Sequence, residues 1–173
     1  MNLKEFIREV PNWPKEGINF KDITTILENP TAFKFTIDEM TKPFLNDGIN
    51  KIVVIDARGF LLGSVMAYNL KLGISLVRKK GKLPYKTIEE NYEKEYGFDV
   101  LTMHEDTIKL NEKVLIVDDL LATGGTLEAT VKMIEKMGGI VAGISVIVDL
   151  PFCGGRKKLE KYKINSLVDY EHE

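Results

Sequence analysis

The hydrophobic and polar positions of the chain fall into short apolar runs separated by longer amphipathic stretches. The apolar runs predict five buried strands, because strands covered on both faces leave little room for polar residues. These runs lie at residues 52–55, 74–77, 114–117, 140–148 and 164–168. Between them, apolar residues three and four positions apart predict helices over residues 60–72 and 126–137. This alternation predicts an α/β fold with a mostly parallel, twisted sheet flanked by helices.

The remaining segments are less regular. Helical spacing over residues 3–10 predicts an N-terminal helix, and prolines then begin an irregular segment that continues to residue 21. A second amphipathic helix is expected to begin at Asn29-Pro30 and to end near residue 47. A short basic helix is expected near residues 155–162. No linker composition is visible, so residues 1–173 are expected to form one domain.

Composition and charge narrow the class of protein. A chain of 173 residues with 44% hydrophobic and 29% charged residues is typical of one soluble globular domain. The 24 basic and 26 acidic residues give a net charge of −2, which argues against a dedicated nucleic-acid-binding protein. Cys153 is the single cysteine, so no intrachain disulfide can form. Because signal-peptide and membrane-spanning patterns are also missing, we expect a cytoplasmic protein without membrane or nucleic-acid partners.

The most informative window is Val114–Thr126, which reads VLIVDDLLATGGT. An apolar strand ends in two carboxylates, Asp118 and Asp119, and a loop of threonine and glycine runs directly into a helix. Glycines let the backbone approach a phosphate, and the free N–H groups of a first helical turn attract anions. Carboxylates accept hydrogen bonds from hydroxyl groups or bind hard cations. The window therefore predicts a sugar-phosphate site at the carboxyl end of a strand.

This window resembles the signature of the type I phosphoribosyltransferases, which bind phosphoribosyl pyrophosphate. The resemblance implies that Asp118 and Asp119 contact the ribose hydroxyls. It also implies that five consecutive residues hold the 5′-phosphate, namely Ala122, Thr123, Gly124, Gly125 and Thr126. The window lacks the GxxxxGK[ST] pattern of P-loop proteins. A type I phosphoribosyltransferase fold is therefore expected, with residues 114–138 as the phosphoribosyl pyrophosphate motif and its helix.

A second site follows the strand at 52–55, where the sequence reads IDARGF. Arg58 stands at the carboxyl end of a buried strand and can offer a bidentate guanidinium fork to pyrophosphate. The (E/D)-(A/S)-R-G-F pattern is similar to that of the adenine phosphoribosyltransferases. The resemblance implies that Ala57 and Arg58 form the pyrophosphate-binding turn and that Arg58 takes part in catalysis.

Residues 79–103 are expected to form a flexible flap loop with ribbon-like arms. Loops of this length are often active-site lids, and a lid that closes over the site excludes water. The strings RKKGKLP and YEKEYG resemble the corresponding region of the adenine phosphoribosyltransferases. The resemblance implies that Lys79 and Lys82 assist pyrophosphate. It further implies that Glu95 handles the proton at the purine nitrogen and that Tyr96 positions or shields the substrates.

Residues 1–28 are expected to form a hood over a purine pocket, because WPKEGINFKDI combines aromatic residues with proline and glycine. The segment resembles the family pattern P-x-x-G-(I/V)-x-F-(R/K)-D. The resemblance implies that Phe20 stacks on adenine, that the backbone near Asn19 reads its edge, and that Leu150 lines the opposite side. Lys21 stands where many members have arginine, and it keeps a positive charge near the base without bidentate geometry.

The resemblance implies transfer of the 5-phosphoribosyl group from phosphoribosyl pyrophosphate to adenine, giving AMP and pyrophosphate in purine salvage. Mg²⁺ is the expected cofactor, held mainly by the substrate and through water by Asp118 or Asp119. No metal site built from histidine or cysteine is expected, because His104, His172 and Cys153 lack partners at metal-ligand spacing. The family is typically dimeric, and the apolar helix at 60–72 is a candidate interface for a homodimer.

Two alternatives stay open. One is a phosphoribosyltransferase for hypoxanthine, guanine or xanthine, and the strings IDARGF and YEKEYG weigh against it. The other is a non-catalytic regulator that senses phosphoribosyl pyrophosphate and binds nucleic acid, although the chain has no room for an added helix-turn-helix domain. Assays with each base distinguish the first, and salt-dependent binding to nucleic acid without turnover identifies the second.

Overall fold

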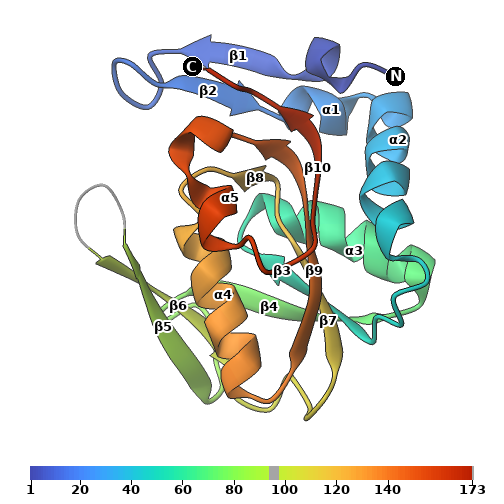
Figure 1. Ribbon diagram of the computed structural model, residues 1–173, viewed down its shortest axis with the longest axis vertical. Coiled ribbons are helices and arrows are strands. Elements are labelled where there is room, and N and C mark those ends of the chain that lie inside the picture. The colour runs from blue at the N-terminus through green and yellow to red at the C-terminus, as the bar shows by residue number, and fades with distance from the viewer. Residues whose placement is uncertain (94–97, 173) are drawn as a thin grey trace.

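The computed structural model describes residues 1–93 and 98–172. Its central sheet has the strand order β10-β9-β7-β3-β4-β6-β5, and β8 pairs with β9 beside this path (Figure 1). The strands span Lys51–Ile55 (β3), Gly73–Lys79 (β4), Thr87–Glu93 (β5), Phe98–His104 (β6), Lys113–Val117 (β7), Leu120–Leu121 (β8), Ile140–Asp149 (β9) and Ile164–Asp169 (β10). Neighbours from β10 to β4 are parallel, whereas β4 with β6 and β6 with β5 are antiparallel. The prediction of a mostly parallel sheet is confirmed.

Two helices precede β3, and the others connect parallel strands of the sheet. They span Thr24–Glu28 (α1), Pro30–Thr41 (α2), Arg58–Leu70 (α3), Gly125–Lys136 (α4) and Gly155–Lys158 (α5), with short 3-10 turns at Leu3–Phe6, Lys42–Phe44 and Pro151–Cys153. The predicted helices at 60–72 and 126–137 are confirmed as α3 and α4. The side chain of Asn29 accepts hydrogen bonds from the N–H groups of Thr31 and Ala32. It therefore caps α2, whose first residue is proline.

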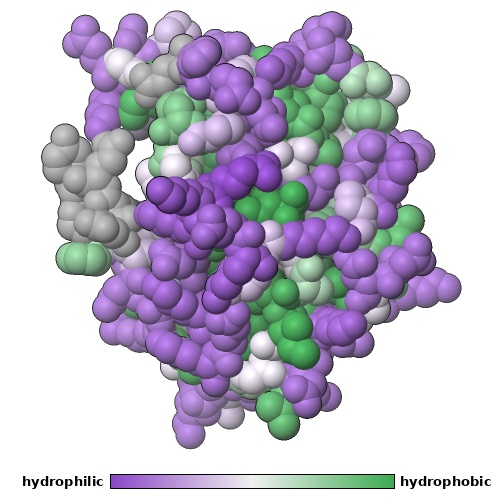
Figure 2. Space-filling model, viewed as in Figure 1, coloured by the Kyte–Doolittle hydropathy of each residue, from purple (hydrophilic) through white to green (hydrophobic). Residues whose placement is uncertain are grey.

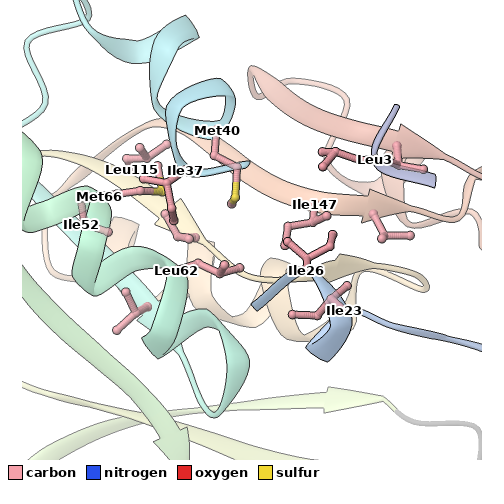
Figure 3. Packing of buried hydrophobic residues seen from close by; sticks show 14 of the residues in the cluster. Leu3, Ile23, Ile26, Ile37, Met40, Ile52, Leu62, Met66, Leu115 and Ile147 are labelled. Atoms are coloured by element: carbon pink, nitrogen blue, oxygen red, sulfur yellow. The ribbon is translucent and has the colours of Figure 1, made fainter. Parts of the chain in front are cut away.

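The two faces of the sheet carry two hydrophobic clusters. Along β3, Ile52 and Val54 belong to one cluster and Val53 and Ile55 to the other, and all four side chains are buried. Helices α1, α2 and α3 close the first cluster, where Figure 3 shows their side chains packed against those of the strands. Helix α4 closes the second. Since both faces are covered, the strands read as continuous apolar runs.

The predicted helix at 3–10 is wrong. After the 3-10 turn, Arg8–Pro11 forms β1, which pairs antiparallel with β2 (Asn19–Asp22). Leu3 and Ile7 are buried in the first cluster. Their helical spacing therefore arises although one lies in a 3-10 turn and the other directly precedes a strand. Figure 1 shows this hairpin beside the C-terminus. The predicted irregular segment therefore ends at residue 18.

The charged segment after β4 contains a second hairpin. Strands β5 and β6 pair antiparallel along their whole lengths and form ribbon-like arms. Glu90 on β5 makes an ion pair with Lys136 on α4, so the hairpin is fixed to the body of the protein. Residues 94–97, between the two strands, lie outside the described part of the chain.

The surface that carries α5 and β10 is largely hydrophilic, and its apolar side chains form separate small patches (Figure 2). Within residues 1–93 and 98–172, no helix has both the length and the apolar character needed to cross a membrane.

Candidate active site

The loops after β3 and β7 meet at one edge of the sheet, because these strands are parallel neighbours. They enclose a pocket of about 300 Å³. Its lining consists of Ile55, Asp56, Ala57, Arg58, Asp118, Asp119, Leu120, Ala122, Thr123, Gly124, Gly125, Thr126 and Leu127. All residues predicted to contact the ribose and the 5′-phosphate belong to this lining, and so does Arg58. Two sequence windows far apart in the chain thus form one site.

Arg58 begins α3, and its Nε donates a hydrogen bond to the carboxylate of Asp119. Gly59 allows this approach, since a Cβ at that position would stand 2.8 Å from a backbone oxygen at the end of β7. The Asp56–Ala57 peptide in the same turn is cis. Partial burial opposes the charge on Arg58, but the neighbouring Asp119 carboxylate raises the pKa of Arg58 overall. The pocket therefore contains a fixed guanidinium cation.

Asp118 and Asp119 have different surroundings. Asp119 is only 6% exposed and has the Arg58 guanidinium as its counter-charge. Asp118 accepts a hydrogen bond of 2.9 Å from the backbone N–H of Asp119. Burial, together with repulsion from the Asp119 carboxylate, raises the pKa of Asp118 well above its ordinary value. Hydroxyl donors or a cation brought next to Asp118 would therefore stabilise its ionised form.

The loop after β8 leads the backbone along the pocket into α4. Gly124 has a φ of +77°, in the left-handed region that other residues rarely adopt, and α4 begins at the next residue. The first N–H groups of α4 have no intrahelical acceptors, which is the arrangement that binds phosphate. Gly155 supports this loop from behind, because its N–H donates to the carbonyl of Ala122 at 3.0 Å. A Cβ on Gly124 would stand 2.9 Å from Gly155 Cα, so the contact requires glycine.

The predicted purine segment reaches the pocket through Phe20. The Phe20 ring centroid lies 5.7 Å from the Arg58 guanidinium carbon and 4.4 Å from the Trp13 ring, in an edge-on contact. Side chains alternate along a strand, so Asn19 and Lys21 point to the opposite face of β2. There both donate to the Glu9 carboxylate, at 2.5 and 2.7 Å. The Lys21 ammonium group thus lies on the face of β2 opposite the Phe20 ring.

The base of the charged hairpin is linked to the pocket. Arg78 Nε pairs with the Asp56 carboxylate at 2.8 Å, and Arg78 Nη1 donates to the carbonyl of Lys82 at 3.1 Å. Lys79 pairs with Asp99 at 3.2 Å, and the side chain of Lys82 is exposed. The predicted flap residues Lys79 and Lys82 therefore stand at the stem of the hairpin, joined through Arg78 to the turn that carries Arg58.

Three predicted residues remain to be placed. Leu150 follows β9, is partly buried against the first cluster, and donates its N–H to the carbonyl of Leu121 at 2.9 Å. Glu95 and Tyr96 lie outside the described residues. Sequence reasoning missed the parts played by Asp56 and Gly155 in building the pocket. The doubled glycine at 154–155 was the one available signal for Gly155.

The acidic part of the pocket suits a hard cation. Asp118 and Asp119 offer carboxylate oxygens, the ligand type that Mg²⁺ prefers. In the described part of the chain, no group of three or more His, Cys, Asp or Glu side chains is placed to hold a metal ion. The two carboxylates therefore fit a magnesium ion that takes most of its ligands from a substrate and water.

Comparison with known proteins agrees with this geometry. The family model for the phosphoribosyl transferase domain matches residues 22–172. An adenine phosphoribosyltransferase from Brachyspira hyodysenteriae is 55% identical over 98% of this chain and 100% of its own length. The crystal structure of an adenine phosphoribosyltransferase from Thermoanaerobacter pseudethanolicus has a TM-score of 0.94 and 46% identity, covering 97% of this chain and 98% of its own.

A third relative was crystallised with ligands. It is the adenine phosphoribosyltransferase of Saccharomyces cerevisiae, complexed with adenine and an imino-altritol bisphosphate. It has a TM-score of 0.91 and 36% identity, and the match covers 96% of each chain. The sequence motifs, the pocket they form and the full-length similarity agree, and the chain belongs to the adenine phosphoribosyltransferases of the phosphoribosyltransferase family.

Proposed function

We propose that this enzyme transfers the 5-phosphoribosyl group of phosphoribosyl pyrophosphate to adenine, giving AMP and pyrophosphate in purine salvage. The observation that carries the proposal is the pocket in which Asp118, Asp119 and the phosphate loop face Arg58. The full-length identity to adenine phosphoribosyltransferases supports adenine as the base. In the reaction, the bond from the ribose carbon to pyrophosphate breaks, a bond to a purine nitrogen forms, and that nitrogen loses its proton.

The pocket residues bind phosphoribosyl pyrophosphate. Residues 122–126 and the first turn of α4 hold the 5′-phosphate, because this backbone presents N–H groups without acceptors. The Asp118 and Asp119 carboxylates accept hydrogen bonds from the ribose hydroxyls. Arg58, aided by Lys79 and Lys82 at the hairpin stem, stabilises the negative charge that develops on the departing pyrophosphate. These contacts position the ribose carbon and stabilise the transition state.

Mg²⁺ is the cofactor that the carboxylate donors suit. It would be held mainly by the substrate, with Asp118 or Asp119 bound to it through water. When bound, it neutralises charge on the pyrophosphate as the pyrophosphate leaves.

The base occupies the space beside Phe20. Phe20 stacks on adenine, the backbone near Asn19 reads its edge, and Leu150 lines the opposite side. Glu95, in the flap at 79–103, accepts the purine proton, and Tyr96 shields the substrates. The hood at 1–28, this flap and the motif at 114–138 then belong to a single domain that spans residues 1–173.

The assembly and location follow from the surface and composition. Leu61 and Tyr68 are 51% and 84% exposed on α3, an apolar surface that supports a homodimer interface. The single cysteine supports a cytoplasmic location, where disulfides are rare.

Steady-state assays with phosphoribosyl pyrophosphate and each purine base test the proposal. We expect AMP from adenine, with little product from hypoxanthine, guanine or xanthine. Lack of adenine turnover in the presence of Mg²⁺ would refute the proposal. Turnover of another base alone would assign the enzyme to the first alternative, and salt-dependent nucleic-acid binding without turnover would identify a regulator.

A further inference from the structure

Lys21 is buried although it carries a charge. Its side chain is 3% exposed, and its Nζ lies 2.7 Å from the Glu9 carboxylate on β1. The same Nζ lies 4.3 Å from the centroid of the Tyr170 ring. A desolvated ammonium group over an aromatic face is attracted to it more strongly than one in water. Lys21 thus joins β2 to the C-terminal segment from the face of the strand opposite Phe20.

The backbone of Tyr170 is hydrogen-bonded to the end of β9. Its backbone N–H donates to the carbonyl oxygen of Asp149 at 3.0 Å. Asp149 is the last residue of β9, is fully buried, and directly precedes Leu150. Its carboxylate is fixed by Arg156 at 2.5 Å. The end of β9 is therefore a rigid support for Tyr170.

These contacts form a continuous path between the two residues assigned to opposite sides of the base. Phe20 is bonded to Lys21, Lys21 packs on Tyr170, and Tyr170 is hydrogen-bonded to the residue before Leu150. Within the described residues, β2 pairs in a sheet with β1 alone, a strand that lies outside the central sheet. The position of Phe20 relative to β9 therefore depends on contacts such as this one.

We infer that Lys21 and Tyr170 form a brace that sets the separation between Phe20 and Leu150, and so determines the fit of the base without touching it. Both are positioning residues in this role, which rests on the proposed function. Glu9 completes the brace, since its carboxylate receives Lys21 and Asn19 together. The hydrogen bond from Lys21, and then that from Asn19, lowers the pKa of Glu9 and keeps this carboxylate ionised.

The test is a comparison of Michaelis constants in Lys21→Met, Tyr170→Leu and Lys21→Arg. Lys21→Met keeps the length of the side chain but removes its charge, and Tyr170→Leu removes the ring. For both, we expect the KM for adenine to rise about tenfold, as for loss of a desolvated cation–π contact. The KM for phosphoribosyl pyrophosphate should change less than about twofold, because both variants keep the pairing of β9 with β8 and the Arg156–Asp149 ion pair, which hold the strand ends next to the phosphate loop. Lys21→Arg keeps the cation and should behave like wild type.

Lys161→Met is the matched control, because Lys161 also stacks on a tyrosine, Tyr162, but on an exposed surface away from the pocket. Thermal unfolding is recorded for each variant, and Tyr170→Leu carries the test if Lys21→Met does not fold. An unchanged KM for adenine would overturn the brace, as would equal increases in both Michaelis constants. Loss of the proposed function is a separate outcome, since the wild-type enzyme would then fail to convert adenine.

Discussion

At the scale of single residues, the two neighbouring carboxyl groups of the pocket are unequal. Asp119 is neutralised by Arg58, whereas burial and the Asp119 charge raise the pKa of Asp118. The folded protein therefore holds the Asp118 proton more tightly than the unfolded chain does. As the pH rises from the ordinary aspartate pKa to the raised one, the folded protein loses stability, and above the raised pKa that loss is complete.

Replacing Asp118 by asparagine should remove this pH-dependent loss. At pH 8, Asp118→Asn should unfold at a higher temperature than wild type, because the variant has no charge at this buried position. The difference should shrink at pH 4, where the wild-type carboxyl group is protonated. Differential scanning calorimetry at both values measures it, with exposed Asp106→Asn as the control. A variant no more stable than wild type at pH 8 would contradict the unfavourable burial of the charge.

Asp119→Asn should weaken the binding of phosphoribosyl pyrophosphate and leave the stability of the folded protein nearly unchanged. Loss of a charged hydrogen-bond acceptor to the ribose should raise the KM for phosphoribosyl pyrophosphate roughly 10- to 100-fold. The melting temperature should change little, because Arg58 is 42% exposed and water can hydrate its freed guanidinium group. Steady-state kinetics with adenine saturating give the answer, and an unaltered KM would remove Asp119 from the ribose site.

Much of the pocket at this scale could be predicted from the sequence. Arg58, the two aspartates and residues 122–126 each follow a recognisable strand, and parallel strands end at the same edge. The pairing of Arg58 with Asp119 could not be predicted, since it depends on how closely Gly59 lets α3 approach β7. The direction of the Lys21 side chain could not be predicted either. It is set by β2, which is too short for an alternation of apolar and polar residues to be visible in the sequence.

At the scale of elements, long apolar runs were predicted well and short polar strands were not. Strands β3, β7 and β9 are buried on both faces, so their composition alone identifies them. Strands β1 and β2 have four residues each and expose most of their side chains at least partly. Their pairing depends on partners eight to fourteen positions away, such as Arg8 with Asp22, and local periodicity does not record these.

The contact between the phosphate loop and α5 gives a prediction at this scale. Gly155→Ala adds a methyl group that would collide with the carbonyl oxygen of Ala122, so the loop must shift. We expect the free energy of unfolding to fall by about 1–3 kcal/mol. The KM for phosphoribosyl pyrophosphate should rise with it, because the same loop carries Gly124.

Gly73→Ala is the control for this substitution, because a Cβ at Gly73 meets no atom within 4 Å. Urea denaturation and kinetics are measured on both variants. A Gly155→Ala protein that matches Gly73→Ala in stability and in KM would show that the loop does not rest on α5.

At the scale of the whole molecule, the sheet separates two hydrophobic clusters and holds the functional loops at one edge. The apolar surface of α3 is left exposed, and it supports the proposed homodimer. We expect wild-type protein to sediment as a dimer and Leu61→Asp as a monomer, because a buried aspartate in an apolar interface lacks a partner. Leu110→Asp, at a side chain that is 77% exposed, is the control. Sedimentation velocity with circular dichroism distinguishes dissociation from unfolding, and a dimeric Leu61→Asp protein would rule out this surface as the interface.

The edge-on contact between Trp13 and Phe20 has an optical consequence. Trp13 is the only tryptophan in the chain, so the indole emission of the protein comes from one point, 4.4 Å from the ring expected to stack on the base. Adenine that stacks on Phe20 should change the intensity of this emission. The exposed tyrosines Tyr68 and Tyr85 contribute little when excitation is confined to the indole band. Titration with adenine should follow a saturable curve that is lost in Phe20→Leu. The hood thus carries a built-in fluorescent reporter, which would allow base occupancy to be followed in real time on unlabelled protein.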